Sequence, residues 1–339
     1  MTATPIWHDL RTLTIEGQGW TDTLSPYDRL PARAAGKVPD PVWHLSQDSA
    51  GLCARFQTDA PALRARWTLR KEALAMVHMP ATGVSGLDLY TRAGNTWRWL
   101  AIARPDHFPT SEAELIGGLP VAAREYLLYL PLYNGVLSVE LGIPQGYTLT
   151  PSPPRPTRPI VFYGTSITQG GCAARPGSCH PALLGRRLDR PVINLGFSGN
   201  GKMEKPVAEL LAELDPSIYV IDCLPNMVAE QIVERAPELV RILRDARPKT
   251  PILLVEDRSY SDAFLHPERA ERNRTSRTAL QQVYADLRDI RELHYLEGED
   301  LLGADGDDTV DGSHPTDLGF KRQAEAFYPA LSRILADQP

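Results

Sequence analysis

A segment dense in proline divides this chain into two parts with different hydrophobic patterns. Five of the ten residues from position 150 to position 159 are proline, in a chain of 339 residues. Such a segment forms an extended and fairly stiff connector. We predict an N-terminal domain over residues 1–150, a proline-rich linker over 151–158 and a C-terminal domain over 159–339.

The part before the linker consists of short segments in which every second residue is apolar. This alternation is typical of strands with one buried and one exposed face. Turn-forming residues such as Asn134 and Gly135 separate them, and no helical pattern of useful length intervenes. We expect an all-β, jelly-roll-like antiparallel sandwich, with strands near residues 13–15, 52–56, 63–69, 87–90, 97–102, 126–130 and 136–141.

After the linker, strand-like and helix-like segments alternate. The strand-like runs are almost entirely apolar, which is typical of parallel strands covered on both faces. We predict an α/β domain with strands near 160–163, 192–195, 218–224, 252–255 and 293–296, and with helices near 180–188, 204–214, 228–246, 268–287 and 318–335. In such sheets, ligands bind beyond the carboxyl ends of the strands.

Composition and charge disfavour several classes of protein. Apolar residues make up 42% of the chain and the formal net charge is −6, so neither nucleic acid nor an anionic membrane is an expected partner. No apolar run approaches the ~18 residues of a membrane span. The first ten residues lack the basic start and apolar stretch of a signal peptide, which predicts a cytoplasmic protein.

The four cysteines indicate neither a zinc site nor a disulfide scaffold. Their spacing fits no zinc pattern, and they are few for a chain of this length. Cys172 and Cys179 could pair across a short loop, and the alternative is four reduced cysteines. The sequence leaves both open, and we expect no metal and no cofactor.

Two distant segments supply the groups needed for acyl transfer. Ser166 stands in Gly164-Thr165-Ser166-Ile167, directly after the first predicted parallel strand, and His314 closes Asp311-Gly312-Ser313-His314. A serine becomes nucleophilic when a histidine takes its proton and an aspartate orients that histidine. The alternative is that Asp311 and His314 only cap the last helix, with Pro315 as an early helical residue.

Donors for a developing oxyanion are available after the next two strands. Gly199 lies in a glycine-rich loop after the second strand, and Asn226 lies in the loop after the third. A competing nucleophile is Ser198, because residues 196–200 nearly spell Gly-x-Ser-x-Gly, but the fifth residue is Asn200. Arg258, after the fourth strand, could bind a substrate oxygen or form a structural ion pair.

These motifs resemble those of the SGNH (GDSL-like) hydrolase family over residues 159–339. The resemblance rests on Ser166 with its neighbours, Gly199, Asn226 and the Asp311-x-x-His314 pattern. It implies a flavodoxin-like three-layer domain, the triad Ser166, Asp311 and His314, and an oxyanion hole of the Ser166 and Gly199 N–H groups with the Asn226 side chain. The chain departs from the family pattern at Thr165, where an aspartate is usual, and around Asn226, where only the asparagine is kept.

A sandwich preceding such a domain resembles a subgroup of carbohydrate esterases. The resulting hypothesis is a serine esterase that removes short acyl groups, above all O-acetyl groups, from a carbohydrate. Its expected partner is a small-molecule or oligosaccharide ester, and a homo-oligomer is possible. The alternatives are a general short-chain or lipid-type esterase and a glycan-binding protein with a vestigial site. Fold-level analogy alone does not identify a substrate.

Overall fold

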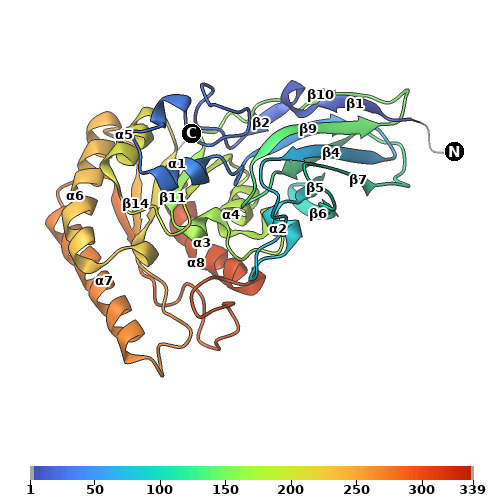
Figure 1. The fold of residues 1–339 in the computed structure, drawn as a ribbon. Helices are drawn as coiled ribbons and strands as arrows, with labels where there is room; N and C mark the ends of the chain where they lie inside the picture. Colours follow the sequence, from blue (N-terminus) through green and yellow to red (C-terminus); the bar gives the residue numbers. More distant parts are fainter. Residues whose placement is uncertain (1–3, 337–339) are drawn as a thin grey trace. The chain divides into compact units, whose positions relative to one another are not determined.

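The computed structural model describes residues 4–336, so the first three residues of the N-terminal stretch and the last three of the C-terminal domain lie outside it. Contacts divide the chain into two compact units (Figure 1). The first comprises the described residues up to Ala32, Ser46–Arg155 and Ala174–Gly177, and the second comprises the rest. Relative to the predicted domains, residues 33–45 and 174–177 belong to the other unit, and the predicted linker 151–158 is divided between the units after Arg155.

The first unit is an antiparallel sandwich, as predicted. One sheet has the strand order β1-β9-β4-β7, and the other has the order β10-β3-β8-β5-β6 with β2 paired to β3. The strands are β1 (Ile6–Asp9), β2 (Thr14–Glu16), β3 (Cys53–Thr58), β4 (Leu63–Leu69), β5 (Leu87–Ala93), β6 (Thr96–Ala103), β7 (Thr110–Ile116), β8 (Arg124–Tyr129), β9 (Val136–Ile143) and β10 (Leu149–Pro151). Alternate residues of both sheets, among them Phe56, Trp67 and Leu128, form its core.

The strands that the sequence did not predict are β1, β7 and β10, and each lies at an edge of its sheet. An edge strand has a neighbour on one side only and buries less apolar surface, so its alternation is weak. The sequence also missed two short helices, α1 (Asp40–Ser46) and α2 (Ala81–Val84). Their seven and four residues are too few to establish a helical period.

The second unit contains a five-stranded parallel sheet in the order β12-β11-β13-β14-β15. Numbered within the unit, this is the flavodoxin-like order 2-1-3-4-5. The strands are β11 (Ile160–Gly164), β12 (Val192–Gly196), β13 (Ile218–Asp222), β14 (Ile252–Val255) and β15 (Leu293–Leu296). The predicted α/β fold is therefore confirmed.

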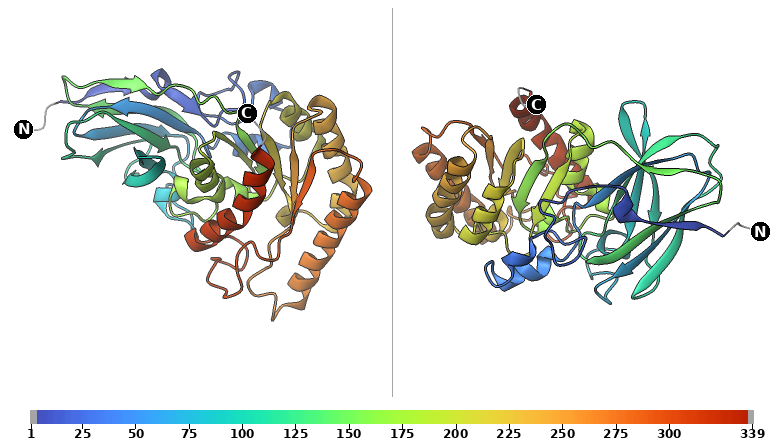
Figure 2. Two further views of the ribbon diagram at one scale, coloured as in Figure 1. Left: turned by 180° about the vertical axis from the view of Figure 1, so that it is seen from behind. Right: turned by 90° about the horizontal axis from the view of Figure 1, so that it is seen from above.

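Helices cover both faces of this sheet and give three layers. They are α4 (His180–Leu188), α5 (Lys205–Glu213), α6 (Ala229–Ala246), α7 (Pro267–Asp286) and α8 (Asp317–Leu335). One face packs against α4 and α8 through a core that includes Phe162, Leu184 and Phe327 (Figure 2). On the other face α6 packs between α5 and α7. Within residues 4–336, no helix combines the length and apolar character that crossing a bilayer requires.

The strand order creates a switch point beside β11. The chain passes from β11 to β12 on one side and returns to β13 on the other, so the loops after all three strands meet at the carboxyl edge of the sheet. A one-turn helix, α3 (Ser166–Gln169), follows β11 at this edge. The sequence did not predict α3 because four residues carry no periodic signal.

Candidate active site

A tight turn places Ser166 at the start of α3. The hydroxyl of Thr165 accepts a hydrogen bond from the Ile167 N–H at 3.3 Å, so the residue in place of the usual aspartate caps this helix. The strand approaches the turn so closely that a Cβ on Gly164 would lie 2.2 Å from Thr168 Oγ1. Only glycine fits there, which explains the residue that precedes Thr165.

The structure brings Ser166, His314 and Asp311 into one hydrogen-bonded chain. Ser166 Oγ lies 2.9 Å from His314 Nε2, and His314 Nδ1 lies 2.8 Å from Asp311 Oδ2. An ionised carboxylate only accepts hydrogen bonds, so Nδ1 carries the ring proton and Nε2 is left to accept from the serine hydroxyl. This is the protonation state in which a histidine acts as a general base.

Asp311 and His314 lie in a turn before α8 and do not cap that helix. The cap is Thr316, whose hydroxyl accepts from the Gly319 N–H at 3.3 Å. Asp311 Oδ1 accepts from the N–H groups of Ser313 (3.1 Å) and His314 (2.8 Å). Partial burial acts to raise the pKa of Asp311, but the hydrogen bonds from His314 outweigh it, and the pKa lies below its usual value.

Two of the three candidate oxyanion donors, Gly199 and Asn226, lie on loops that contact each other. Gly199 has a φ of +68° in the loop after β12, and Asn226 ends a single 3₁₀ turn, η4 (Leu224–Asn226), after β13. The Asn226 Nδ2 donates a hydrogen bond to the carbonyl of Asn200. The roles of the Ser166 and Gly199 N–H groups and of Asn226 in holding an oxyanion stay predictions.

Side chains not singled out by the sequence hold these loops against α3. Asn194 donates from Nδ2 to the Thr168 carbonyl (2.7 Å), and its Oδ1 accepts from the Gly196 N–H (2.9 Å). Gln169 Oε1 accepts from the Ser198 N–H at 3.0 Å. The sequence feature that could have indicated this supporting role is the single polar residue, Asn194, within the apolar run of a buried strand.

Arg258 forms a buried ion pair. Its Nη1 and Nη2 donate to the two carboxylate oxygens of Asp222 at 2.6 and 2.5 Å, and both side chains are almost completely buried. Asp222 also accepts from Thr168 Oγ1 on α3 at 3.2 Å. Of the two roles considered for Arg258, the geometry shows the structural one.

His180 and the cysteines belong to the protein interior. His180 is fully buried, its ring stacks on Phe320 with centroids 5.9 Å apart, and burial lowers its pKa to about 3. All four cysteines occur as buried thiols, which is the second of the two possibilities considered. Burial raises the pKa of the Cys172 thiol to about 12. Among residues 4–336, no cluster of three or more His, Cys, Asp or Glu side chains could hold a metal ion.

The structure thus defines a three-layer α/β domain in which a serine, a histidine and an aspartate are in hydrogen-bond contact, and sequence comparison agrees with a hydrolase of this kind. Residues 157–332 match the GDSL-like lipase/acylhydrolase family, and residues 6–149 match the GxDLY family, described as the N-terminus of SGNH-hydrolase-type esterases. The chain therefore belongs to the GDSL-like lipase/acylhydrolase family of carboxylic ester hydrolases.

Solved structures share the architecture over nearly the whole chain. A protein from Bacteroides ovatus described as a GDSL-like lipase is 32% identical, with 98% of each chain covered and a TM-score of 0.94. The salicylyl acyltransferase SsfX3 of a tetracycline biosynthetic pathway is 19% identical, with 97% of each chain covered and a TM-score of 0.75. A family two carbohydrate esterase from Clostridium thermocellum is 15% identical, with 85% of this chain and 93% of that chain covered and a TM-score of 0.59. No match is found among the curated proteins.

The GxDLY pattern occurs here as residues 86–90, a segment whose sequence predicts only a strand. Asp88 is fully buried, and both its carboxylate oxygens lie 3.0 Å from Arg175 Nη1. It also accepts from the Gly177 N–H at 2.9 Å and from Trp99 Nε1 at 3.0 Å. The hydrogen bonds of Asp88 thus hold Arg175 and Gly177 against the sandwich, within the first unit.

Proposed function

We propose that this protein is a serine esterase that removes short acyl groups, above all O-acetyl groups, from a carbohydrate. The observation that carries the esterase chemistry is the hydrogen-bonded chain from Ser166 through His314 to Asp311. The carbohydrate part is supported by architecture, because a family two carbohydrate esterase has this fold.

In the first half of the reaction, Ser166 Oγ attacks the ester carbonyl while His314 Nε2 takes the hydroxyl proton. The carbonyl oxygen becomes an oxyanion. We assign its stabilisation to hydrogen bonds from the N–H groups of Ser166 and Gly199 and from the Asn226 side-chain amide. His314 then gives its proton to the departing alcohol oxygen, and an acyl-serine ester remains. Asp311 keeps the imidazole oriented and stabilises its protonated form.

In the second half, water replaces the alcohol. His314 takes a proton from the water molecule while the water oxygen attacks the acyl-serine carbonyl carbon. The proton returns to Ser166 Oγ when the second tetrahedral intermediate collapses, which releases the carboxylic acid and restores the enzyme.

A second candidate is a lipid-type or general short-chain esterase with the same residues, favoured by the 32% identity to the Bacteroides ovatus protein described as a GDSL-like lipase. The acyl chain length separates the two, because activity that rises with chain length contradicts the acetyl proposal. A glycan-binding protein with a vestigial site is disfavoured, since such a protein has no need to keep the three side chains hydrogen-bonded.

The deciding experiment measures p-nitrophenol release from acetyl, butyryl and octanoyl esters. We expect wild type to prefer acetate and Ser166→Ala to lose at least about 10³-fold in kcat, because the nucleophile is removed. Ser198→Ala is the matched control and should keep wild-type activity. Undiminished turnover by Ser166→Ala would contradict the assignment, and loss in Ser198→Ala would favour the alternative nucleophile. Acetylated oligosaccharides then test the carbohydrate part.

A further inference from the structure

The loop that carries Asn226 has little regular structure of its own. Its local hydrogen bonds run from the Asn226 N–H to the Cys223 carbonyl at 3.1 Å and from the Met227 N–H to the Leu224 carbonyl at 2.9 Å. One 3₁₀ turn has poorer hydrogen-bond geometry than an α-helix. A side chain on such a loop needs outside support if it is to hold one orientation.

Arg272 on α7 provides that support from both sides of Asn226. Its Nη2 donates to the Pro225 carbonyl oxygen at 2.8 Å and to the Met227 carbonyl oxygen at 3.3 Å. Pro225 and Met227 are the residues directly before and after Asn226. Its Nη1 forms an ion pair with Asp257 Oδ2 at 2.9 Å. One planar guanidinium thus ties two backbone carbonyls to a carboxylate, a geometry that a lysine cannot reproduce.

Asp257 in turn is held in place by α7. Only 4% of Asp257 is exposed, and burial raises the pKa of its carboxyl group, an effect that Arg272 opposes. Asn273 Nδ2 donates to Asp257 Oδ2 at 3.2 Å, and Arg277 Nε donates to the Asp257 carbonyl at 3.0 Å. Arg272 is therefore anchored to a rigid partner and does not simply follow the loop.

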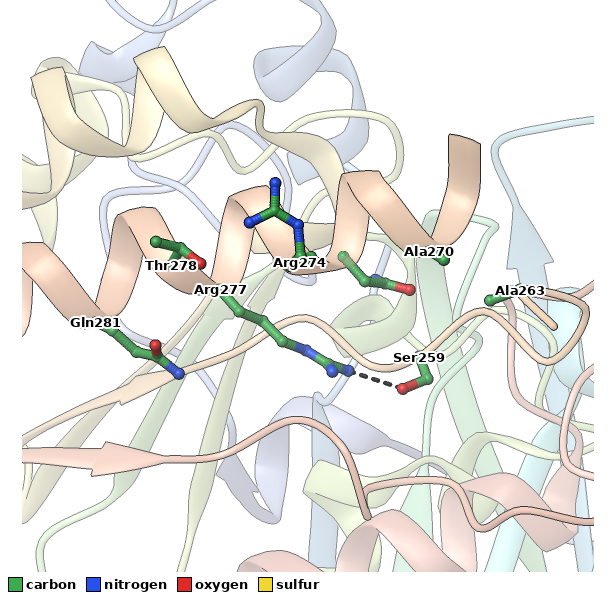
Figure 3. A pocket seen from close by; sticks show the side chains of 8 residues that line it. Ser259, Ala263, Ala270, Arg274, Arg277, Thr278 and Gln281 are labelled. Carbon is green, nitrogen blue, oxygen red and sulfur yellow. Dashed lines mark hydrogen bonds between the residues drawn. The ribbon is translucent and has the colours of Figure 1, made fainter. Parts of the chain in front are cut away.

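Figure 3 shows the next turns of the same helix, along a pocket of about 370 Å³ that includes Ser259, Arg274 and Arg277. Arg277 reaches across it and donates from Nη2 to Ser259 Oγ at 2.9 Å, whereas Arg274 points away from Ser259 (Figure 3). Arg274 pairs instead with exposed Glu271 on its own helix. Both arginines have partners, so we assign no ligand to this pocket, and Arg274 offers a control for Arg272.

We propose that Arg272 is a positioning residue for the oxyanion hole, which it serves by fixing the Pro225–Met227 backbone so that Asn226 can donate to the oxyanion. The inference rests on the proposed function, because it assumes acyl transfer at Ser166. A single oxyanion donor contributes about 10²–10³-fold to kcat. A donor that is present but displaced loses part of that contribution, since the stabilisation of the developing charge falls when the donor shifts by about 1 Å.

The test compares Arg272→Ala, Arg272→Lys and Asn226→Ala with wild type on p-nitrophenyl acetate. We expect Arg272→Ala to lower kcat by about 10–100-fold with KM nearly unchanged, and Arg272→Lys to recover only part of the loss. Inhibition by a short alkyl boronic acid, whose serine adduct is tetrahedral, should weaken by the same factor as kcat. A loss of correctly folded protein alone would also lower kcat at unchanged KM, but it would leave the boronic acid affinity of the remaining enzyme unchanged.

The double variant shows whether Arg272 acts through Asn226. If it does, Arg272→Ala combined with Asn226→Ala is no slower than Asn226→Ala alone, whereas independent effects multiply. Arg274→Ala should match wild type. The inference would be overturned if the losses in kcat multiply in the double variant, if Asn226→Ala leaves kcat unchanged, or if both Arg272 variants keep the wild-type kcat. Activity that survives Ser166→Ala would instead overturn the proposed function. If Arg272→Ala does not fold, Arg272→Lys alone decides through its kcat and boronic acid affinity.

Discussion

Asp222 is a single residue on which several parts of the candidate site depend. Asp222 is the last residue of β13. Its carboxylate accepts two hydrogen bonds from Arg258 and a third from Thr168, which lies two residues after Ser166 on α3. Both members of the ion pair are withdrawn from water, so each charge is tolerated only because the other is present.

Removing one partner of this pair should therefore be costly. We expect Arg258→Met to lower the free energy of unfolding by about 3–5 kcal/mol, because it leaves the Asp222 charge buried and uncompensated. Adding Asp222→Asn to this variant should recover part of the loss. Urea unfolding followed by circular dichroism measures both. Arg322→Met, which breaks a more exposed pair with Asp305, should lose much less, and equal losses for the two arginines would contradict the argument.

At the scale of elements, the segment between β14 and α7 supports the turn that carries Asp311 and His314. The Ser261 N–H donates to the Gly312 carbonyl at 3.0 Å. Ser261 Oγ donates to Asp308 Oδ1 at 2.7 Å and lies 2.9 Å from Thr309 Oγ1, while that Thr309 hydroxyl oxygen accepts from the Gly312 N–H at 3.1 Å. The segment that precedes α7 thus holds the turn of Asp311 and His314, and Arg272 within α7 holds the loop of Asn226.

Ser261→Ala should lower kcat/KM by about tenfold, because the turn loses the hydrogen bonds of the Ser261 hydroxyl to Asp308 and Thr309 and His314 moves relative to Ser166. The loss of stability should stay near 1 kcal/mol, since the backbone hydrogen bond to Gly312 remains. Steady-state kinetics and thermal unfolding measure the two effects. Thr275→Ala removes a hydroxyl that bonds only along its own helix and serves as the control. Wild-type kinetics in Ser261→Ala would show that the turn holds without this contact.

At the scale of the whole molecule, His180 predicts how stability depends on pH. The ring is buried among Phe162, Phe320 and Phe327, and neither of its nitrogens has a hydrogen-bond partner among the described residues. The charged groups nearest to it are Asp222, with an oxygen 3.8 Å from Nε2, and the Arg258 paired with that carboxylate. Burial lowers its pKa to about 3, whereas an unfolded histidine titrates near 6.5.

Below pH ~6.5 the unfolded chain binds a proton at His180 that the folded chain does not bind, so stability falls as the pH falls. The slope approaches about 1.4 kcal/mol per pH unit down to pH ~3, where the folded histidine is also protonated and the loss stops growing. His180→Phe keeps an aromatic ring and should flatten this dependence while matching wild type at pH 8. Urea unfolding from pH 8 to 4 tests it. Parallel curves for the two proteins would show that His180 does not titrate as described.

Much of the fold could be predicted because the central elements bury wide apolar surfaces that repeat with a regular period. The predictions for β4, β14 and α4 coincide with the structure at both ends. The edge strands β1, β7 and β10 and the one-turn helix α3 were missed because they bury little or are too short. In the candidate site, the sequence predicted that Ser166, Asp311 and His314 meet, and in the structure they are in hydrogen-bond contact.

Periodicity and local motifs along the chain were sufficient to predict the order of the long elements and the three side chains of the candidate triad. The contacts that hold those side chains in place exist only in the folded protein. Arg258 with Asp222, Arg272 with the carbonyls beside Asn226, and Ser261 with Gly312 are pairs distant in sequence. Many charged and polar residues could have met, and no local pattern marks which ones do. The packing of α7 and of the strand ends makes that choice, because a hydrogen bond requires contact within about 3 Å.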